Sequence, residues 1–283
     1  MRRSGVLAYK LRAQKGMVIY MDLHDYEDVA NNYDNYLEVM HSKENTYDGF
    51  QEFYEKLAQE YGAGGIIDIA CGTGAVLLNL AAKGYDVCGM DLSGAMVEAA
   101  KKKAWDLGLN IPIFSANMTD FTCDRRFSLA IIARSGFLHL TTPELQRKAL
   151  LNIREKLLPG GILTLNTFAP HARIQCRMMD TSPEDYSLRL EYTNSQGLRE
   201  RIYNAVTYDP VSQRMYGNWK FETLNDHNET IETRIRPVSM RQTYRQEMLY
   251  LIELCGFKIA AIYGDYHYSA DNNNNLVWIL RRS

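Results

Sequence analysis

Short apolar runs alternate with helix-type patterns in the central part of the chain. The runs predict strands at residues 66–70, 86–90, 111–116, 127–133 and 162–167. Between them, apolar residues recur every three or four positions, as they do on one face of a helix. Ser93 and Thr142-Pro143 can begin such helices, and Gly84 can end one. Strands that alternate with helices predict a parallel sheet covered by helices on both faces.

The pattern differs on either side of this region. Residues 22–57 show helical spacing and are rich in tyrosine. Between residues 186 and 240, four segments alternate polar and apolar residues and are separated by turn residues, which predicts an antiparallel sheet. A helix at residues 244–255 and two strands at 258–263 and 276–280 close the chain. We therefore expect one α/β core that carries a β-rich insertion.

Composition and charge narrow the functional classes. The 283 residues carry a formal net charge of −2, and only the first twenty are strongly basic, so a nucleic-acid partner is disfavoured. No apolar run is long enough to span a bilayer. The five cysteines are odd in number, widely spaced and without a CxxC motif, which indicates reduced thiols in a cytoplasmic protein. The six histidines have no metal-ligand spacing, so we expect no metal site.

The stretch Ile66–Gly74, which reads Ile-Ile-Asp-Ile-Ala-Cys-Gly-Thr-Gly, is the most informative in the chain. It predicts a strand, a glycine turn and a helix N-terminus, whose free N–H groups and partial positive charge suit dinucleotides and S-adenosylmethionine alike. The third glycine of a dinucleotide motif is replaced by Leu77. Asp68 would repel a pyrophosphate but suits an ammonium group. Asp91, at the end of the next strand, can accept hydrogen bonds from the ribose of either ligand.

Five motifs in order make the chain resemble the class I S-adenosylmethionine-dependent methyltransferases, of the small-molecule type with a β-rich insertion. They are Ile66–Gly74, Val87-Cys-Gly-Met-Asp-Leu-Ser, Asn117-Met-Thr-Asp-Phe, Phe127-Ser-Leu-Ala-Ile-Ile-Ala and Leu157-Leu-Pro-Gly-Gly-Ile-Leu-Thr-Leu. The resemblance implies a Rossmann-like, mostly parallel seven-stranded sheet with the last strand antiparallel, helices on both faces, and an antiparallel β insertion. It also implies in-line methyl transfer from S-adenosylmethionine to N or O of a small molecule, with S-adenosylhomocysteine as the product.

The residue patterns and this resemblance together divide the chain into parts. Residues 1–21 would be a flexible leader, and residues 22–60 an N-terminal helical lid. Residues 61–180 and 241–283 would form the methyltransferase core. Residues 181–240 would be the insertion, which would either cap the active site or form the interface of a homodimer.

The resemblance further implies which residues would bind the cofactor. They lie on the lid or close to the ends of the first four strands: Tyr33, Asp68, Ala70, Gly72, Gly74, Asp91, Leu92, Met96, Asn117, Met118 and Arg134. Asp68 would hold the methionine end and Asp91 the ribose hydroxyls. Leu92 and Met96 would pack against adenine, and the Asn117 carbonyl would accept from the adenine amino group.

Two residues are candidates for catalysis, and each has a structural alternative. His139 follows the fourth strand and could act as a base, or it could pack inside the Phe137-Leu-His-Leu turn. The ring of Tyr33 could lie beside the sulfonium, or it could pack its helix on the core. Arg241, in the last part of the chain, could anchor the insertion or contact an acidic substrate.

Two other functions stay open at the level of the sequence. A nicotinamide-dependent oxidoreductase would bind its dinucleotide at Gly72 and Gly74, and a titration with NADH would reveal it. A catalytically silent protein would keep the S-adenosylmethionine site without an acceptor pocket. Only a screen for activity distinguishes that protein from an enzyme, because a fold does not fix a function.

Overall fold

The computed structural model describes residues 30, 33–44, 47–168, 171–270 and 275–283. The expected leader, residues 1–21, lies outside the described residues. All five cysteines are free thiols. Over the described residues, no helix is both long enough and apolar enough to cross a membrane.

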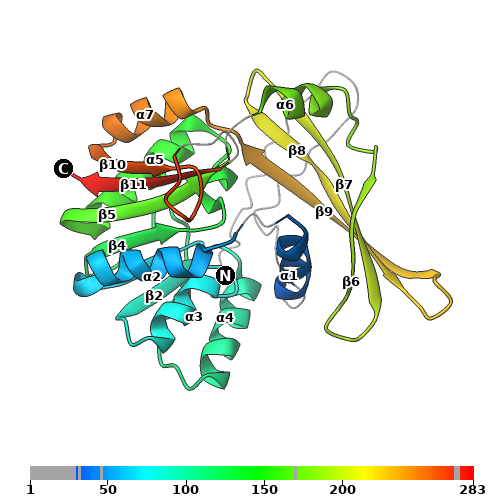
Figure 1. The fold of residues 1–283 in the computed structure, drawn as a ribbon, viewed down its shortest axis with the longest axis horizontal. Helices are drawn as coiled ribbons and strands as arrows, with labels where there is room; N and C mark the ends of the chain where they lie inside the picture. The colour runs from blue at the N-terminus through cyan, green and yellow to red at the C-terminus, as the bar shows by residue number, and fades with distance from the viewer. Residues whose placement is uncertain (1–29, 31–32, 45–46, 169–170, 271–274) are drawn as a thin grey trace, which may run out of the picture.

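The core of the molecule is a seven-stranded sheet with the order β10-β11-β5-β4-β1-β2-β3 (Figure 1). Its strands are β1 Ile66–Ile69, β2 Val87–Asp91, β3 Ile113–Ser115, β4 Phe127–Ile132, β5 Leu157–Thr167, β10 Phe257–Tyr263 and β11 Leu276–Arg282. The last strand, β11, runs antiparallel to both β5 and β10, while the pairs from β5 to β3 are parallel. The predicted fold class, including the antiparallel last strand, is confirmed.

Helices cover both faces of this sheet. On one face, α2 Phe50–Tyr61, α3 Ala75–Ala82 and α4 Gly94–Asp106 bury apolar side chains such as Phe53 and Leu80. On the other, α5 Pro143–Lys156 and α7 Arg245–Leu254 bury a second cluster that includes Ile153 and Met248. Removing this apolar surface from water is the main stabilising contribution, and it fixes the sheet between the two helical layers.

The insertion forms a separate antiparallel sheet with the order β6-β7-β8-β9 (Figure 1). Its strands are β6 Ser187–Thr193, β7 Arg199–Asp209, β8 Arg214–Leu224 and β9 Thr230–Arg241. The antiparallel sheet predicted from alternating residues is confirmed. Figure 1 shows α1, Tyr33–Glu44, between this sheet and the core. The domain limits drawn from the sequence stay predictions.

One helix was not predicted from the sequence. Helix α6, Ala172–Met179, has only eight residues, and its buried side chain is the polar Gln175. The Gln175 amide nitrogen donates to Gln242 Oε1 at 2.9 Å, and Tyr244 donates to Gln175 Oε1 at 3.2 Å. The apolar side chains Ile174 and Met179 are exposed, and eight residues are too few for the spacing of apolar positions to predict a helix.

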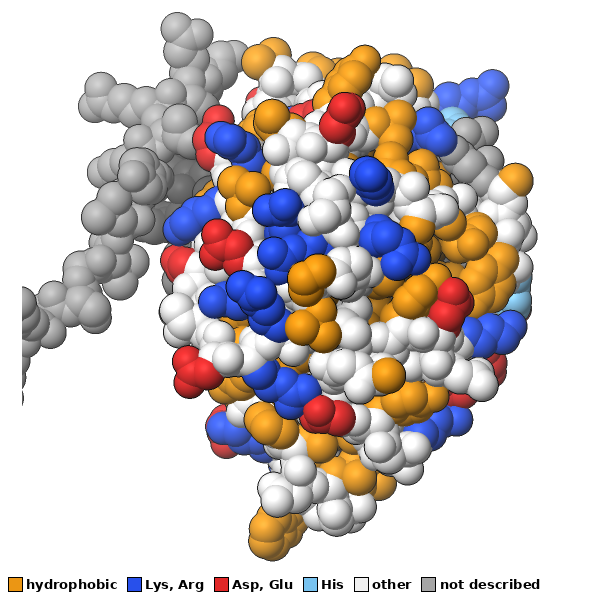
Figure 2. Space-filling view, turned by 90° about the vertical axis from the view of Figure 1, so that its left-hand side faces the viewer, with side chains coloured by type: hydrophobic (Ala, Val, Ile, Leu, Met, Phe, Trp, Pro, Cys, Tyr) orange, Lys and Arg blue, Asp and Glu red, His pale blue; other side chains and the backbone are white. Residues whose placement is uncertain are grey.

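Basic side chains gather on the face shown in Figure 2, at the end of the sheet where strand β11 ends and strand β5 begins. Arg154 donates to the Gly256 carbonyl at 3.2 Å and Arg281 to the Gly160 carbonyl at 3.1 Å. Arg282 donates to the Leu157 carbonyl. These three cations satisfy backbone carbonyls at strand ends, which gives them a structural role.

Candidate active site

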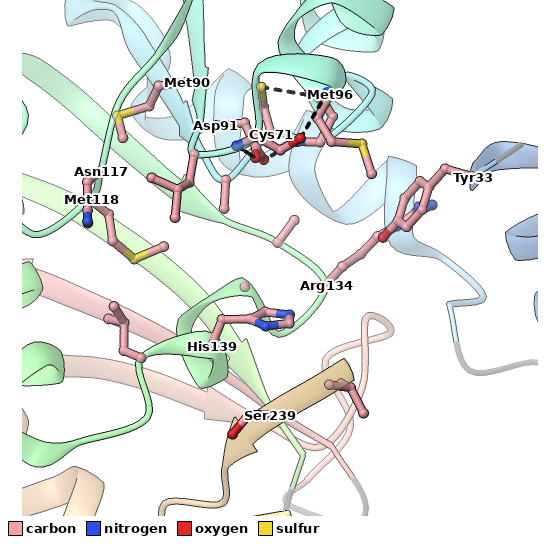
Figure 3. A pocket seen from close by; sticks show the side chains of 18 of the residues that line it. Tyr33, Cys71, Met90, Asp91, Met96, Asn117, Met118, Arg134, His139 and Ser239 are labelled. Carbon is pink, nitrogen blue, oxygen red and sulfur yellow. Dashed lines mark hydrogen bonds between the residues drawn. The ribbon is translucent and has the colours of Figure 1, made fainter. Parts of the chain in front are cut away.

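A cavity of about 510 Å³ lies at the carboxyl ends of β1, β2 and β4 (Figure 3). In open α/β sheets, ligands bind at this edge, where the strand order reverses direction, here between β1 and β4. Of the residues proposed from the sequence, the following line the cavity: Tyr33, Asp68, Ala70, Gly72, Asp91, Leu92, Met96, Asn117, Met118, Arg134 and His139. Gly74 is not among the lining residues.

The glycine loop takes its shape from residues in the left-handed region. Gly72 has φ +56°, and no atom lies within 4 Å of the position that a Cβ would occupy. Gly74, with φ +93°, is the N-cap of α3, where a Cβ would come within 2.9 Å of Leu78 Cγ. Ala70, just before the loop, also has a positive φ of 57°, a conformation that non-glycine residues adopt mainly where the surroundings enforce it. Gly74 therefore shapes the loop, while Gly72 faces open space.

The two carboxyl oxygens of Asp68 on β1 lie in different environments. Its Oδ2 accepts from the Leu77 N–H of α3 at 3.1 Å, so it stabilises the start of that helix. Its Oδ1 is buried and has no hydrogen-bond partner among the described residues. Burial raises the pKa of Asp68 to about 8, against a partial lowering by the Leu77 hydrogen bond. A buried carboxyl oxygen at a cavity wall, without a partner, fits a cationic ligand group.

Asp91, at the end of β2, holds the glycine loop. Its Oδ2 accepts from the Gly72 N–H at 2.8 Å, and its Oδ1 accepts from the Ser93 N–H at 2.9 Å. Figure 3 shows this carboxylate beside the loop at the cavity. Each carboxylate oxygen can accept more than one hydrogen bond, so Asp91 retains capacity toward a ligand.

Leu77 shows how the fold manages without the third glycine of a dinucleotide motif. A methyl group at Gly89 on β2 would lie 2.4 Å from Leu77 Cδ2 and 3.1 Å from Cys71 Sγ. Helix α3 can therefore pack closely on the sheet because strand β2 has a glycine, Gly89, at the contact. The large side chain at this contact, Leu77, is on the helix.

The Asn117 side chain is oriented differently from the sequence-based expectation. Its Oδ1 accepts from the Thr119 N–H at 3.0 Å and from the Thr119 hydroxyl at 2.9 Å. Both acceptor positions of the carbonyl are thereby used within the turn, and the NH2 group is left for a ligand. Asn side chains commonly form hydrogen bonds within their own turn. The expected role of Asn117 rested on its position in the motif and took no account of this tendency.

The loop after β4 is held by a residue that the sequence did not single out. Arg134 and Ser135 have φ values of 50° and 59°. Asn166 on β5 accepts from the Ser135 N–H at 2.9 Å and donates to the Ser135 hydroxyl at 3.0 Å. The Arg134 guanidinium lies over the rings of Tyr47 and Phe50, at 5.5 and 5.1 Å from their centroids. This network fixes a positive charge at the cavity wall, near enough to Asp68 to lower the pKa of that carboxyl.

His139 ends the short helix η3, Gly136–His139, and its ring faces the cavity (Figure 3). Burial, together with the positive charge of Arg236, lowers the pKa of His139 to about 4. The imidazole is therefore neutral at pH 7. The sequence offered a base or a side chain packed in the turn as alternatives. The ring packs in the turn and also lines the cavity, and its part in catalysis stays a prediction.

The insertion supplies the cavity wall that faces His139. Six residues of β8 and β9 contribute to it: Tyr216, Gly217, Asn218, Pro237, Val238 and Ser239. Sequence reasoning placed none of them in the site. Strand alternation gives their exposure, but nothing in it indicates that this sheet face meets the core. Ligand pockets occur preferentially at such interfaces between separately folded parts of a protein.

Comparison with known proteins shows a methyltransferase domain in the core region of the chain. A family profile described as "Methyltransferase domain" matches residues 66–161. A Geobacillus sp. (strain WCH70) protein that carries a methyltransferase name is 31% identical over 149 residues, which are 52% of this chain and 58% of that protein. The dTDP-3-amino-3,4,6-trideoxy-alpha-D-glucopyranose N,N-dimethyltransferase of Streptomyces venezuelae is 32% identical over 103 residues, 36% of this chain and 42% of that enzyme. The chain thus matches little more than half the length of the first relative and less than half of the second.

A solved structure extends the comparison to nearly the whole fold. The S-adenosylmethionine-dependent methyltransferase from Clostridium acetobutylicum ATCC 824 superposes with a TM-score of 0.74 at 14% identity. The match covers 89% of this chain and 99% of the other. Residues 66–161 match a methyltransferase domain, and the chain as a whole has the fold of a class I S-adenosylmethionine-dependent methyltransferase.

Proposed function

We propose that this protein transfers the methyl group of S-adenosylmethionine to the amine nitrogen of a small polar molecule. The observation that carries the proposal is the two-walled cavity, with Asp68, Asp91 and Arg134 on the core wall and the β8–β9 residues opposite. The amine is favoured over a hydroxyl because the dTDP-amino-sugar relative is named as an N,N-dimethyltransferase. Incubation with labelled cofactor and matched amine and hydroxyl acceptors tests the choice, and methylation of hydroxyls alone would contradict it.

The residues of the core wall fit the parts of this cofactor. The unpartnered Asp68 Oδ1 would accept from the ammonium group, and the Arg134 guanidinium would bind the carboxylate of the same zwitterion. Asp91 would accept from the ribose hydroxyls. Leu92, 39% exposed although apolar, and Met96 would cover the adenine ring.

When bound, the cofactor supplies an activated methyl carbon on its sulfonium sulfur. The protein's task is then to align a nucleophile and to manage one proton. A neutral amine attacks without help, whereas an ammonium acceptor must first lose a proton. The imidazole of His139 faces the cavity, but with a pKa of about 4 it is too weak a base to take that proton, so the acceptor would bind as the neutral amine. The neutral ring can accept a hydrogen bond from the N–H of this amine and orient it for attack. The Tyr33 ring, on the lining of the same cavity, would lie beside the sulfonium.

We expect His139→Ala to lower kcat by about tenfold, the loss expected for one hydrogen bond that orients the acceptor amine. The affinity for S-adenosylhomocysteine should stay the same, because the ring faces the acceptor wall. His227→Ala, in the exposed turn between β8 and β9, is the matched control and should retain full turnover. Equal turnover in both variants would leave His139 with a packing role only.

The raised pKa of Asp68 leads to a prediction about how ligand affinity depends on pH. Its carboxyl is protonated below about pH 8, and binding of an ammonium group favours the carboxylate, so binding releases a proton. The affinity for S-adenosylhomocysteine should therefore rise about tenfold per pH unit from pH 6 toward pH 7.5, and level off near pH 8, where Asp68 is already ionised in the free protein. Calorimetry in phosphate and in Tris at pH 6.5 should show release of roughly one proton.

Asp68→Asn is the control for this linkage, because the amide has a similar shape but does not titrate in this range. The variant should bind more weakly at pH 7.5 and show no proton release. A wild-type affinity that is constant from pH 6 to 8 would contradict the role of Asp68 as the ammonium partner.

A further inference from the structure

Helix α1 touches the glycine loop on one side and the insertion sheet on the other. The Asp34 Oδ1 accepts from the Thr73 hydroxyl at 2.7 Å, and its other oxygen pairs with Lys103 of α4. Lys103 also donates to the Thr73 carbonyl at 3.3 Å. Thr73 lies between Gly72 and Gly74 and lines the cavity. A single carboxylate thus joins α1 to the loop and to the helix that follows Asp91.

The other side of α1 packs on the insertion. Tyr33, Leu37 and Val39 lie against an apolar cluster of the antiparallel sheet that is formed by Leu190, Tyr192, Ile202 and Phe221. Figure 1 shows α1 between the two sheets, and Figure 3 shows Tyr33 at the cavity. Since Tyr33 and Asp34 are neighbours, the position of the Tyr33 ring depends on the contact that Asp34 makes.

We propose that Asp34 is a positioning residue that fastens α1 over the cofactor compartment and so controls how fast the cofactor product leaves. This inference rests on the proposed function. Apolar packing on the insertion is not directional and allows α1 to slide or tilt, whereas the Thr73 hydrogen bond and the Lys103 ion pair define one position. Both partners belong to the parts of the core that hold the glycine loop and the Asp91 side of the cavity. Loss of the Asp34 contact would release α1 and Tyr33 from the cavity and leave the insertion contact intact.

The test compares Asp34→Asn with the wild type in the full-length protein. The dissociation rate of S-adenosylhomocysteine, measured by stopped-flow competition, should rise about fivefold, because the Asn amide can still accept from Thr73 but loses the half-exposed ion pair with Lys103. The KM for S-adenosylmethionine should rise with it, while kcat at saturation changes by less than twofold. Amide hydrogen exchange in α1 should slow on ligand binding in the wild type and stay fast in the variant.

Lys103→Met provides an independent variant that removes the ion pair from the other side. It should show the same direction of change, and the double variant should be no worse than the more affected single variant, because both remove one shared contact. Glu98→Gln is the matched control, since it breaks the Glu98–Lys101 pair on the exposed surface of the same helix α4. Its dissociation rate should equal that of the wild type.

The outcomes separate this inference from the proposed function. If the wild type binds S-adenosylhomocysteine but Asp34→Asn and Lys103→Met release it at the wild-type rate, the role of Asp34 is refuted and the function stands. If the wild type does not bind S-adenosylhomocysteine, the proposed function itself fails. Faster release in Glu98→Gln as well would show a general effect of surface charge and would also overturn the inference.

Discussion

Replacing Asp91 with alanine should weaken the binding of S-adenosylhomocysteine by about a thousandfold, roughly 4 kcal/mol. Two effects combine in this loss. The carboxylate would no longer accept from the ribose hydroxyls, and each such charge-assisted bond contributes about 1.5–3 kcal/mol. The Gly72 and Ser93 N–H groups, which Asp91 now binds at 2.8 and 2.9 Å, would also lose their partner. Calorimetry on the purified variant measures the change directly.

The control for this experiment lies just before the other end of the same strand. Asp86 pairs with Arg125 on the exposed surface, away from the cavity lining. Asp86→Ala removes the same charge, and we expect unchanged affinity. A smaller than tenfold loss in Asp91→Ala, with the wild-type melting temperature retained, would show that the ribose does not lie at this carboxylate.

The second large effect concerns stability. Arg241, at the end of β9, has a side chain that is 6% exposed and binds residues of two helices and of the turn before β8. It donates to Gln146 of α5 at 3.0 Å and to Glu247 of α7 at 2.6 Å, and it also bonds Gln213 before β8. Arg241→Met should lower the free energy of unfolding by about 3–5 kcal/mol, because removal of one partner leaves buried polar groups unsatisfied.

Urea denaturation, followed by circular dichroism, measures this change. Arg173→Met is the matched control, since Arg173 is exposed on the short helix α6 and its loss should change the stability by less than about 0.5 kcal/mol. A similar small change in Arg241→Met would show that apolar packing alone fixes the insertion to the core. Of the two alternatives offered by the sequence, the contacts of Arg241 support the anchor.

The strands of the core could be predicted because each is a short apolar run between clear turn signals. The strand predicted at 127–133 is observed as Phe127–Ile132. The one predicted at 162–167 begins earlier, at Leu157, because Leu157 already pairs with Phe127 of β4 and the strand continues through Pro159-Gly160-Gly161 across an irregular register. Proline and glycine indicate a loop when read alone, and tertiary pairing overrode that preference here.

The two walls of the cavity differ in how far they could be predicted from the sequence. The core wall follows from local motifs, since the residues near Asp68 and Asp91 are fixed by their own strand and turn. The insertion wall, for example Asn218 and Ser239, depends on how a second sheet meets the first, and alternation along a strand carries no information about that contact. Asn166 was missed for a related reason, because its partner Ser135 lies 31 positions away in the chain.

The pairing of Leu77 with Gly89 also bears on how such chains diverge. Leu77 lies on the helix and Gly89 on the neighbouring strand, and the Leu77 side chain fills the space that a side chain at position 89 would need. A larger residue at 89 can be accepted only after a smaller one has appeared at 77, so the two positions are expected to change together during evolution. A glycine placed at 77 alone would open a gap under the helix without creating a dinucleotide site.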